Sequence, residues 1–126
     1  MKRRNEKGQS LVEFALVVPL VILILMAIIE FGFMFNAYIT ITNASREGAR
    51  LGALGSSDTS VVTRVVDTTV ALDPTKISVT ITPANRSRGD MIRVQVNYDY
   101  VLITPIISSI LSPFIDLEAE TVMRVE

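Results

Sequence analysis

The side chains that could do chemistry in this chain are carboxylates, hydroxyls and amines, because its 126 residues include no His and no Cys. Ser–His and Cys–His nucleophile pairs, Cys/His zinc sites, haem ligation by His and disulfides are therefore excluded. No loop carries the spaced acidic residues of a calcium site, and glycine-rich phosphate-binding patterns are missing. We therefore expect a protein that is not an enzyme, with no catalytic residue, no metal, no cofactor and no small-molecule substrate.

Two carboxylates interrupt a long apolar run near the N-terminus. Residues 11–35 contain only two charged side chains, Glu13 and Glu30. As a helix, residues 14–35 would be about 33 Å long, close to the ~30 Å of a bilayer core. A carboxylate in such a run costs up to about 3 kcal/mol at its centre and less near the interface. We expect Glu13 to meet a polar partner or to reach the membrane surface. Glu30 is expected near the opposite surface, either solvated or in contact with another subunit.

The charges that flank this run predict its orientation. Lys2, Arg3, Arg4 and Lys7 precede it, and the next basic residue is Arg46. The positive-inside rule then leaves the N-terminus in the cytoplasm and the C-terminus outside. A cleaved secretory signal would need a shorter apolar region, of about 7–15 residues, and a small-x-small site. The other basic residues are scattered and not interleaved with aromatics, so no nucleic-acid partner is expected.

The helical pattern continues beyond the membrane. Apolar residues recur at intervals of three and four up to Ile41, and no Pro lies between Pro19 and Pro74. This predicts one helix over residues 11–54, about 66 Å long. Pro19 should kink or loosen it, which either helps the helix to pack in an assembly or is simply tolerated.

Small residues recur every four positions in the second half of this helix. Ala44, Gly48 and Gly52 form a stripe that allows another backbone to approach closely. We expect this stripe to meet the chain's own sheet rather than a neighbouring helix. Glu47 and Arg50 lie on a solvated face and are spaced for an i,i+3 ion pair.

The remainder of the chain predicts a small domain. Residues 55–58 break the helix, and valines in residues 61–70 repeat with helical period, which indicates a short second helix. Residues 77–82, 92–100 and 117–125 alternate apolar and polar side chains, as three half-buried antiparallel strands do. Such a domain has too few residues for an independent core, so the outer half of the long helix should supply an apolar face. The predicted class is α+β.

An apolar segment, residues 102–114, lies between the last two strands. Thr104 suits the N-cap of a helix of at most two turns, and Pro105 suits its first position. One face of this helix would carry Ile106, Ile107, Ile110 and Leu111. We expect a lid that closes the small core. The alternative is an exposed patch that docks on a partner or on the membrane.

The residues around Gly8 resemble the cleavage site of type IV prepilins. Gly8 precedes the polar Gln9, and Glu13 lies five residues after Gly8. The resemblance implies that a membrane prepilin peptidase cuts between Gly8 and Gln9 on the cytoplasmic side. Glu13 would then be the fifth residue of the mature chain and would meet the amine of Gln9 on a neighbouring subunit.

Further blocks resemble the TadE-like family, the pseudopilins of the tight-adherence (Tad or Flp) pilus. The blocks are residues 9–16, Pro19, residues 29–32 and residues 43–50. Phe14 stands where major pilins of this system often have Tyr, which suits a minor pseudopilin. The resemblance implies a pilin-like structural component of an adhesion pilus, with other pilins and the pilus assembly platform as partners.

The expected organisation follows from these observations. Residues 1–8 are a basic leader, residues 9–54 are a long helix that is transmembrane at about 14–35, and residues 55–126 are an extracytoplasmic α+β domain. The chain would lie in the cytoplasmic membrane or in an extracellular pilus. The alternative is a single-pass membrane protein whose outer domain binds a ligand or partner without entering a pilus.

Overall fold

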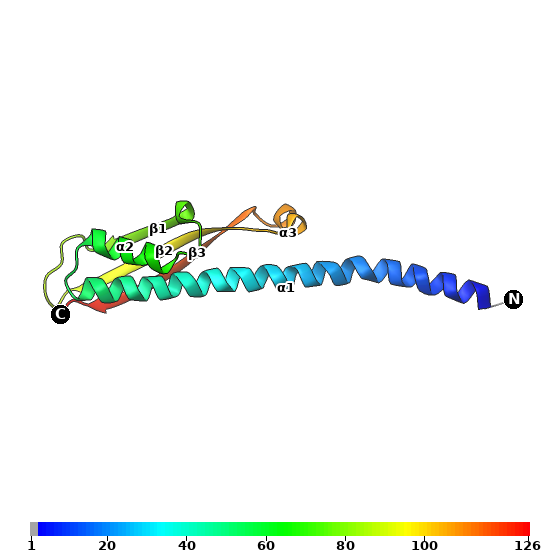
Figure 1. Cartoon of the computed structure of the whole chain (residues 1–126), viewed down its shortest axis with the longest axis horizontal. Helices are drawn as coiled ribbons and strands as arrows, with labels where there is room; N and C mark the ends of the chain where they lie inside the picture. Colours follow the sequence, from blue (N-terminus) through cyan, green and yellow to red (C-terminus); the bar gives the residue numbers. More distant parts are fainter. Residues whose placement is uncertain (1–2) are drawn as a thin grey trace.

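A single helix, α1, runs the length of the molecule (Figure 1). The computed structural model describes residues 3–126, so Met1 and Lys2 of the expected leader lie outside the described residues. α1 spans Arg3–Ala53 and is about 77 Å long at about 1.5 Å per residue. It includes the described part of the leader, because no Pro separates that part from the apolar run.

Pro19 does not break α1. The ring removes one backbone donor, yet the helix is continuous through this position and only gently bowed in Figure 1. Most large apolar side chains between Leu11 and Ile29 are exposed, including Leu16 and Leu20 on either side of the proline. This half of α1 therefore presents apolar side chains that no other described part of the chain covers.

The second helix, α2, spans Asp58–Thr68 and follows a short break. Gly55 has a φ of 84°, a conformation that side chains disfavour, and it lets the chain reverse direction. The hydroxyl of Ser57 then accepts a hydrogen bond from the amide of Ser60 at 3.3 Å and caps the helix. The break and the short helix are where the sequence predicts them.

Within the described residues, one antiparallel sheet has the order β1-β2-β3. A 3-10 turn, η1 (Pro74–Lys76), leads into β1 (Ile77–Thr82), and β2 (Met91–Val101) and β3 (Phe114–Arg124) follow. The α+β class is confirmed. Inward residues alternate as expected, with Val79 opposite Val96 and Val96 opposite Ala119 across the sheet. The other face of the sheet is more exposed and mostly polar.

The core lies between this sheet and the two helices. α1 packs on β2 and β3, and α2 lies beside it, nearer β1 (Figure 1). α1 contributes about a third of the buried apolar side chains. The members of the core on α1, α2 and β2 include Ala37, Ile41, Ala44, Ala49, Ala53, Val61, Val65, Ile92, Val94 and Val96. The domain is therefore completed by the helix from which it extends.

The small-residue stripe of α1 faces this core. Ala44 is fully buried, and a Cβ added to Gly48 would meet side chains of both α2 and β2. A Cβ added to Gly52 would meet Ile92 of β2. The stripe lets α1 approach the chain's own sheet and second helix.

The apolar segment between β2 and β3 departs from the lid that we expected. Its helix, α3, spans Pro105–Ile110 and has no buried residue. Ile106, Ile110 and Leu111 are exposed, and only Ile107 packs partly against the core. The reason is that β2 and β3 remain paired as far as Val101 and Phe114, beyond the end of β1. α3 therefore lies past the end of the core (Figure 1).

We predict that Gly48→Ala lowers the free energy of unfolding by about 1 kcal/mol. The new Cβ would lie 2.7 Å from Cγ2 of Val65. Val65 is fully buried and β-branched, so it yields little. Overpacking costs about 1–3 kcal/mol, more than the gain of up to about 1 kcal/mol from Ala in a helix. Denaturant unfolding in detergent, followed by tyrosine fluorescence, measures the change.

Gly32→Ala is the matched control for this prediction. Gly32 is in the same helix, but nothing lies within 4 Å of an added Cβ. This variant should therefore be at least as stable as the wild type. If Gly48→Ala is as stable as Gly32→Ala, the close approach of α1 to α2 is not as described.

Candidate assembly site

Glu30 connects α1 to the far end of the sheet. Its side chain is only 4% exposed, although it lies in the apolar run. The Tyr100 hydroxyl donates a hydrogen bond of 2.8 Å to Oε1 of Glu30. The amide of Ile103 donates to both carboxylate oxygens, at 3.0 and 3.1 Å, and the amide of Thr104 donates to Oε2 at 2.8 Å. Residues from α1, β2 and the following loop thus meet at one carboxylate.

The local sequence explains why these donors converge. Tyr100 is the last inward-facing residue of β2, so its hydroxyl points across the core toward α1. The amide of Leu102 then donates to the carbonyl of Pro113 at 3.2 Å, which holds the loop closed. Pro105 starts α3 directly after the two donating amides. Burial, and then the Glu30 carboxylate, raise the pKa of the Tyr100 phenol, so this hydroxyl remains a donor.

Neither expectation for Glu30 matches this geometry. Glu30 is neither solvated nor left for another subunit, because groups of its own chain occupy both carboxylate oxygens. The sequence indicated no charged partner for Glu30, because no basic residue lies one helical turn away from it. The partners are a hydroxyl and two amides that lie 70 to 74 positions further along the chain, and backbone amides leave no signal in a sequence. Tyr100, at the end of the apolar face of a predicted strand, is the sequence feature that could have indicated this contact, because a buried hydroxyl needs a partner.

The N-terminal candidates lie far from this cluster, on a bare stretch of α1. Nothing lies within 4 Å of a Cβ added to Gly8. The side-chain amide of Gln9 donates to Oε1 of Glu13 at 3.1 Å within the helix, and Phe14 is 67% exposed. Gly8, Gln9, Glu13 and Phe14 are therefore all exposed on this part of the helix, and Pro19 is exposed as well.

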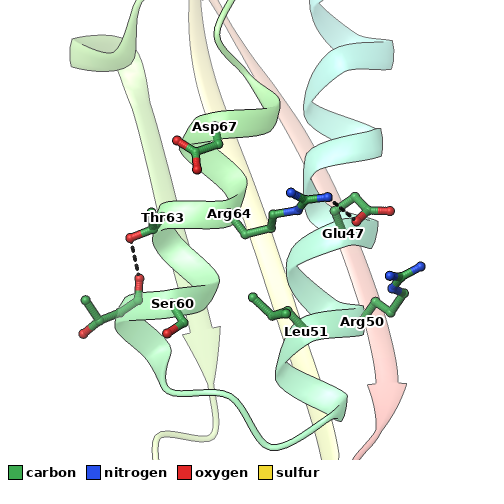
Figure 2. A pocket seen from close by; sticks show the side chains of 8 residues that line it. Glu47, Arg50, Leu51, Ser60, Thr63, Arg64 and Asp67 are labelled. Carbon is green, nitrogen blue, oxygen red and sulfur yellow. Dashed lines mark hydrogen bonds and ion pairs between the residues drawn. The ribbon is translucent and has the colours of Figure 1, made fainter.

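A groove between α1 and α2 contains another group of polar residues (Figure 2). Glu47 pairs with Arg64 of α2 at 3.2 Å (Figure 2), and among the described residues no ion pair joins Glu47 to Arg50, so the expected i,i+3 pair is replaced. Both partners are substantially exposed, and such pairs contribute about 0–1 kcal/mol. The hydroxyl of Thr63 donates to a backbone carbonyl rather than to a base. The ion pair in this groove joins α2 to α1, and the groove contains no activated nucleophile.

Metal and catalytic chemistry find little support in the described part of the chain. Residues 3–126 contain no group of three carboxylates placed to hold a metal ion. Within the same residues, every buried side-chain nitrogen or oxygen has a hydrogen-bond partner. The structure consists of a long helix whose first half is apolar and exposed and whose second half packs on the domain.

Residues 8–50 match the family model described as TadE-like protein. This part of the chain is similar to TadE-like proteins. The match begins at Gly8 and includes Glu13, Phe14, Pro19, Glu30 and most of the helix that packs on the domain. Searches of curated proteins and of solved structures gave no match. The matched residues make up about a third of the chain and all lie in α1.

The apolar half of α1 also indicates a membrane anchor. α1 has the length and composition to cross a membrane, and its most apolar stretch is entirely exposed. An apolar helix of this length near the N-terminus indicates a membrane-anchored protein.

We predict that the Glu30 cluster stabilises the membrane-proximal end of the domain. Glu30→Ala should lower the free energy of unfolding by about 2 kcal/mol, because several buried donors lose their acceptor. Tyr100→Phe removes one donor and should cost about 1 kcal/mol. In the double variant the two losses should couple by about 0.5–3 kcal/mol. Amide hydrogen exchange at Ile103 and Thr104 should become faster in Glu30→Ala.

Glu13→Ala is the control for this experiment. Glu13 lies on the same helix, and among the described residues its hydrogen bond is with Gln9, so exchange at Ile103 and Thr104 should not change. Additive effects of Glu30→Ala and Tyr100→Phe, with unchanged exchange at the two amides, would contradict the described cluster.

Proposed function

We propose that this protein is a minor pseudopilin, a structural component that acts in the assembly of a Tad-type adhesion pilus. The observation that carries the proposal is the TadE-like segment, residues 8–50, on a helix whose first half is apolar and unpartnered. Helix surfaces of this kind are buried either by lipid or by the helices of other subunits. Phe14 supports a minor role, since major pilins of the system often have Tyr there.

The charge distribution supports the proposed membrane topology. Residues 1–8 are a basic leader on the cytoplasmic side, about 14–35 span the cytoplasmic membrane, and residues 55–126 lie outside. Cleavage after Gly8 by a prepilin peptidase removes the basic leader and leaves the amine of Gln9 beside the bilayer. The exposed helix around Gly8 gives a peptidase access to the backbone.

Glu13 is the proposed assembly residue of this helix. Its described partner is the side-chain amide of Gln9 in the same chain, and its side chain is exposed. A charged amine on a neighbouring subunit would be a stronger partner in a low-dielectric setting. Glu13, Phe14 and Pro19 would then lie in the helix contacts with other pilins and with the assembly platform.

We predict that Gly8→Leu blocks maturation. In a host with an active prepilin peptidase, the wild-type chain should begin at Gln9 and Gly8→Leu should keep its leader. The reason is that a bulky side chain hinders access to the scissile bond, whereas glycine does not. Mass spectrometry of the protein isolated from membranes gives both N-termini.

Gly32→Leu makes the same exchange elsewhere on α1, where nothing lies within 4 Å of an added Cβ, and should leave cleavage intact. A wild-type chain that keeps its leader in this host would contradict the proposal. It would favour a membrane-anchored binding protein that is not built into a pilus.

We predict that Glu13→Val inserts in the membrane but assembles poorly. Removing the carboxylate makes the span more apolar, so insertion should be unchanged or improved. The amine of Gln9 on a neighbour would lose its partner, so co-purification with other pilus components and piliation should fall. Glu13→Gln keeps the shape and a hydrogen-bonding oxygen but removes the charge. It therefore separates the contribution of the charge from that of the hydrogen bond. Normal assembly of Glu13→Val would show that Glu13 takes no part in subunit contacts.

A further inference from the structure

The segment around α3 forms an exposed apolar surface, the apolar tip, which consists of Val101, Ile103, Ile106, Ile110, Leu111 and Phe114. Ile110 is 74% exposed and Ile103 is 64% exposed. No charged residue occurs between Asp99 and Asp116. Monomeric soluble domains seldom expose so many neighbouring large apolar side chains, and such a patch marks a surface that something covers.

The position of the apolar tip indicates what covers it. Glu30 binds the amides of Ile103 and Thr104, directly before α3, so the tip is held beside α1. Figure 1 shows α3 beyond the end of the sheet, alongside α1 and on the side of the N-terminus. On α1 itself, the neighbours of Glu30 are exposed and apolar, with Ile29 at 59% and Phe31 at 54%. Two apolar surfaces thus lie at one level of the molecule.

That level falls inside the expected bilayer. Glu30 lies about 26 Å along the helix from Glu13, at about 1.5 Å per residue. A hydrocarbon core of ~30 Å that begins at Glu13 would therefore include Glu30 and reach the level of the apolar tip. A carboxylate at this depth needs donors from the protein, and the Glu30 cluster provides them.

Several polar groups of the apolar tip are paired within the chain, which lowers the cost of lipid contact. The hydroxyl of Ser108 donates to the carbonyl of Pro105 at 2.9 Å, and that of Ser109 donates to the carbonyl of Ile106 at 2.7 Å. The amide of Leu111, after the helix, donates to the carbonyl of Ile107 at 2.9 Å. The two serines therefore do not oppose burial in an apolar surrounding.

We propose that the apolar tip inserts into the outer leaflet of the bilayer that α1 spans, as a second membrane contact of the domain. This inference rests on the membrane anchoring in the proposed function. It assigns a lipid surface, rather than another protein, to the tip while the chain is in the membrane. The domain would then sit on the membrane at a fixed height and orientation.

Single-cysteine labelling of the full chain tests the proposal, because the native sequence contains no Cys. A fluorophore is attached to Ile110→Cys in the tip, to Ile24→Cys in the expected span, and to Leu54→Cys at the distal end of α1. Leu54 is 63% exposed and lies about 36 Å beyond Glu30 along the helix. Each chain is placed singly in a lipid nanodisc, and quenching by brominated phospholipid and by aqueous iodide is measured.

We expect the label at residue 110 to behave like that at residue 24. Brominated lipid should quench both, and iodide should quench both several-fold less than the label at residue 54. If the label at 110 follows the one at 54 while the one at 24 is in lipid, the proposal is overturned and the anchor stands. If iodide also reaches the label at 24, the membrane anchoring and the proposal fail together. If the label at 110 is shielded only when several chains share a disc, and without lipid quenching, the tip binds another copy and the proposal is overturned.

A charged variant checks the cause of the shielding. Ile110→Lys, with the label moved to Ile106→Cys, should increase iodide quenching of that label several-fold, because a lysine draws the short helix toward water. Leu54→Lys with the same label should change nothing. Neither Ile110 nor Leu54 is buried, so both variants should keep the wild-type unfolding midpoint. Unchanged quenching in Ile110→Lys, with the midpoint kept, would show that the tip does not depend on lipid contact.

Discussion

The structure depends on one constraint, which is that the sheet has too little chain behind it to bury its own apolar face. α1 supplies the missing layer with Ala37, Ile41, Ala44 and Ala49, and its small residues allow close contact. The cost of using glycine in a helix, up to about 1 kcal/mol each, is offset by the apolar area that close packing removes from water. A helix that anchors the molecule is thus also part of its core, and the domain has no separate hinge to the anchor.

Contacts at both ends of the domain hold it on α1. At the distal end, the amide of Glu126 donates to the carbonyl of Ala53 at 2.9 Å. At the membrane-proximal end, Glu30 binds Tyr100 and the two amides before α3. Because these contacts lie more than 20 residues apart on one continuous helix, the domain should move with α1 as a unit. For a subunit that assembles through its helix, this would place the domain in a defined position around the axis.

The TadE-like segment of α1 includes two regions that have different surroundings. Around Gly8 and Glu13 the helix is bare, and around Glu30 and Gly48 it meets the chain's own domain. In the proposed function, the first region would be recognised by a peptidase and by other subunits. The second region determines how the domain packs on the helix, so the residues of this segment divide into an exposed set and a buried set.

Periodicity determined most of the fold from the sequence alone. The long helix, the break before Asp58, the strands and their inward faces follow from local patterns, because burial of one face imposes a period of two or near 3.6. The Tyr100–Glu30 contact and the exposed position of α3 were decided only in the tertiary structure. The first joins a side chain to backbone amides far along the chain, and the second depends on how far β2 and β3 extend past β1. Neither a partner amide nor a relative strand length is encoded in local composition, so the lid that the pattern of Ile106, Ile107 and Ile110 indicated became an exposed apolar tip.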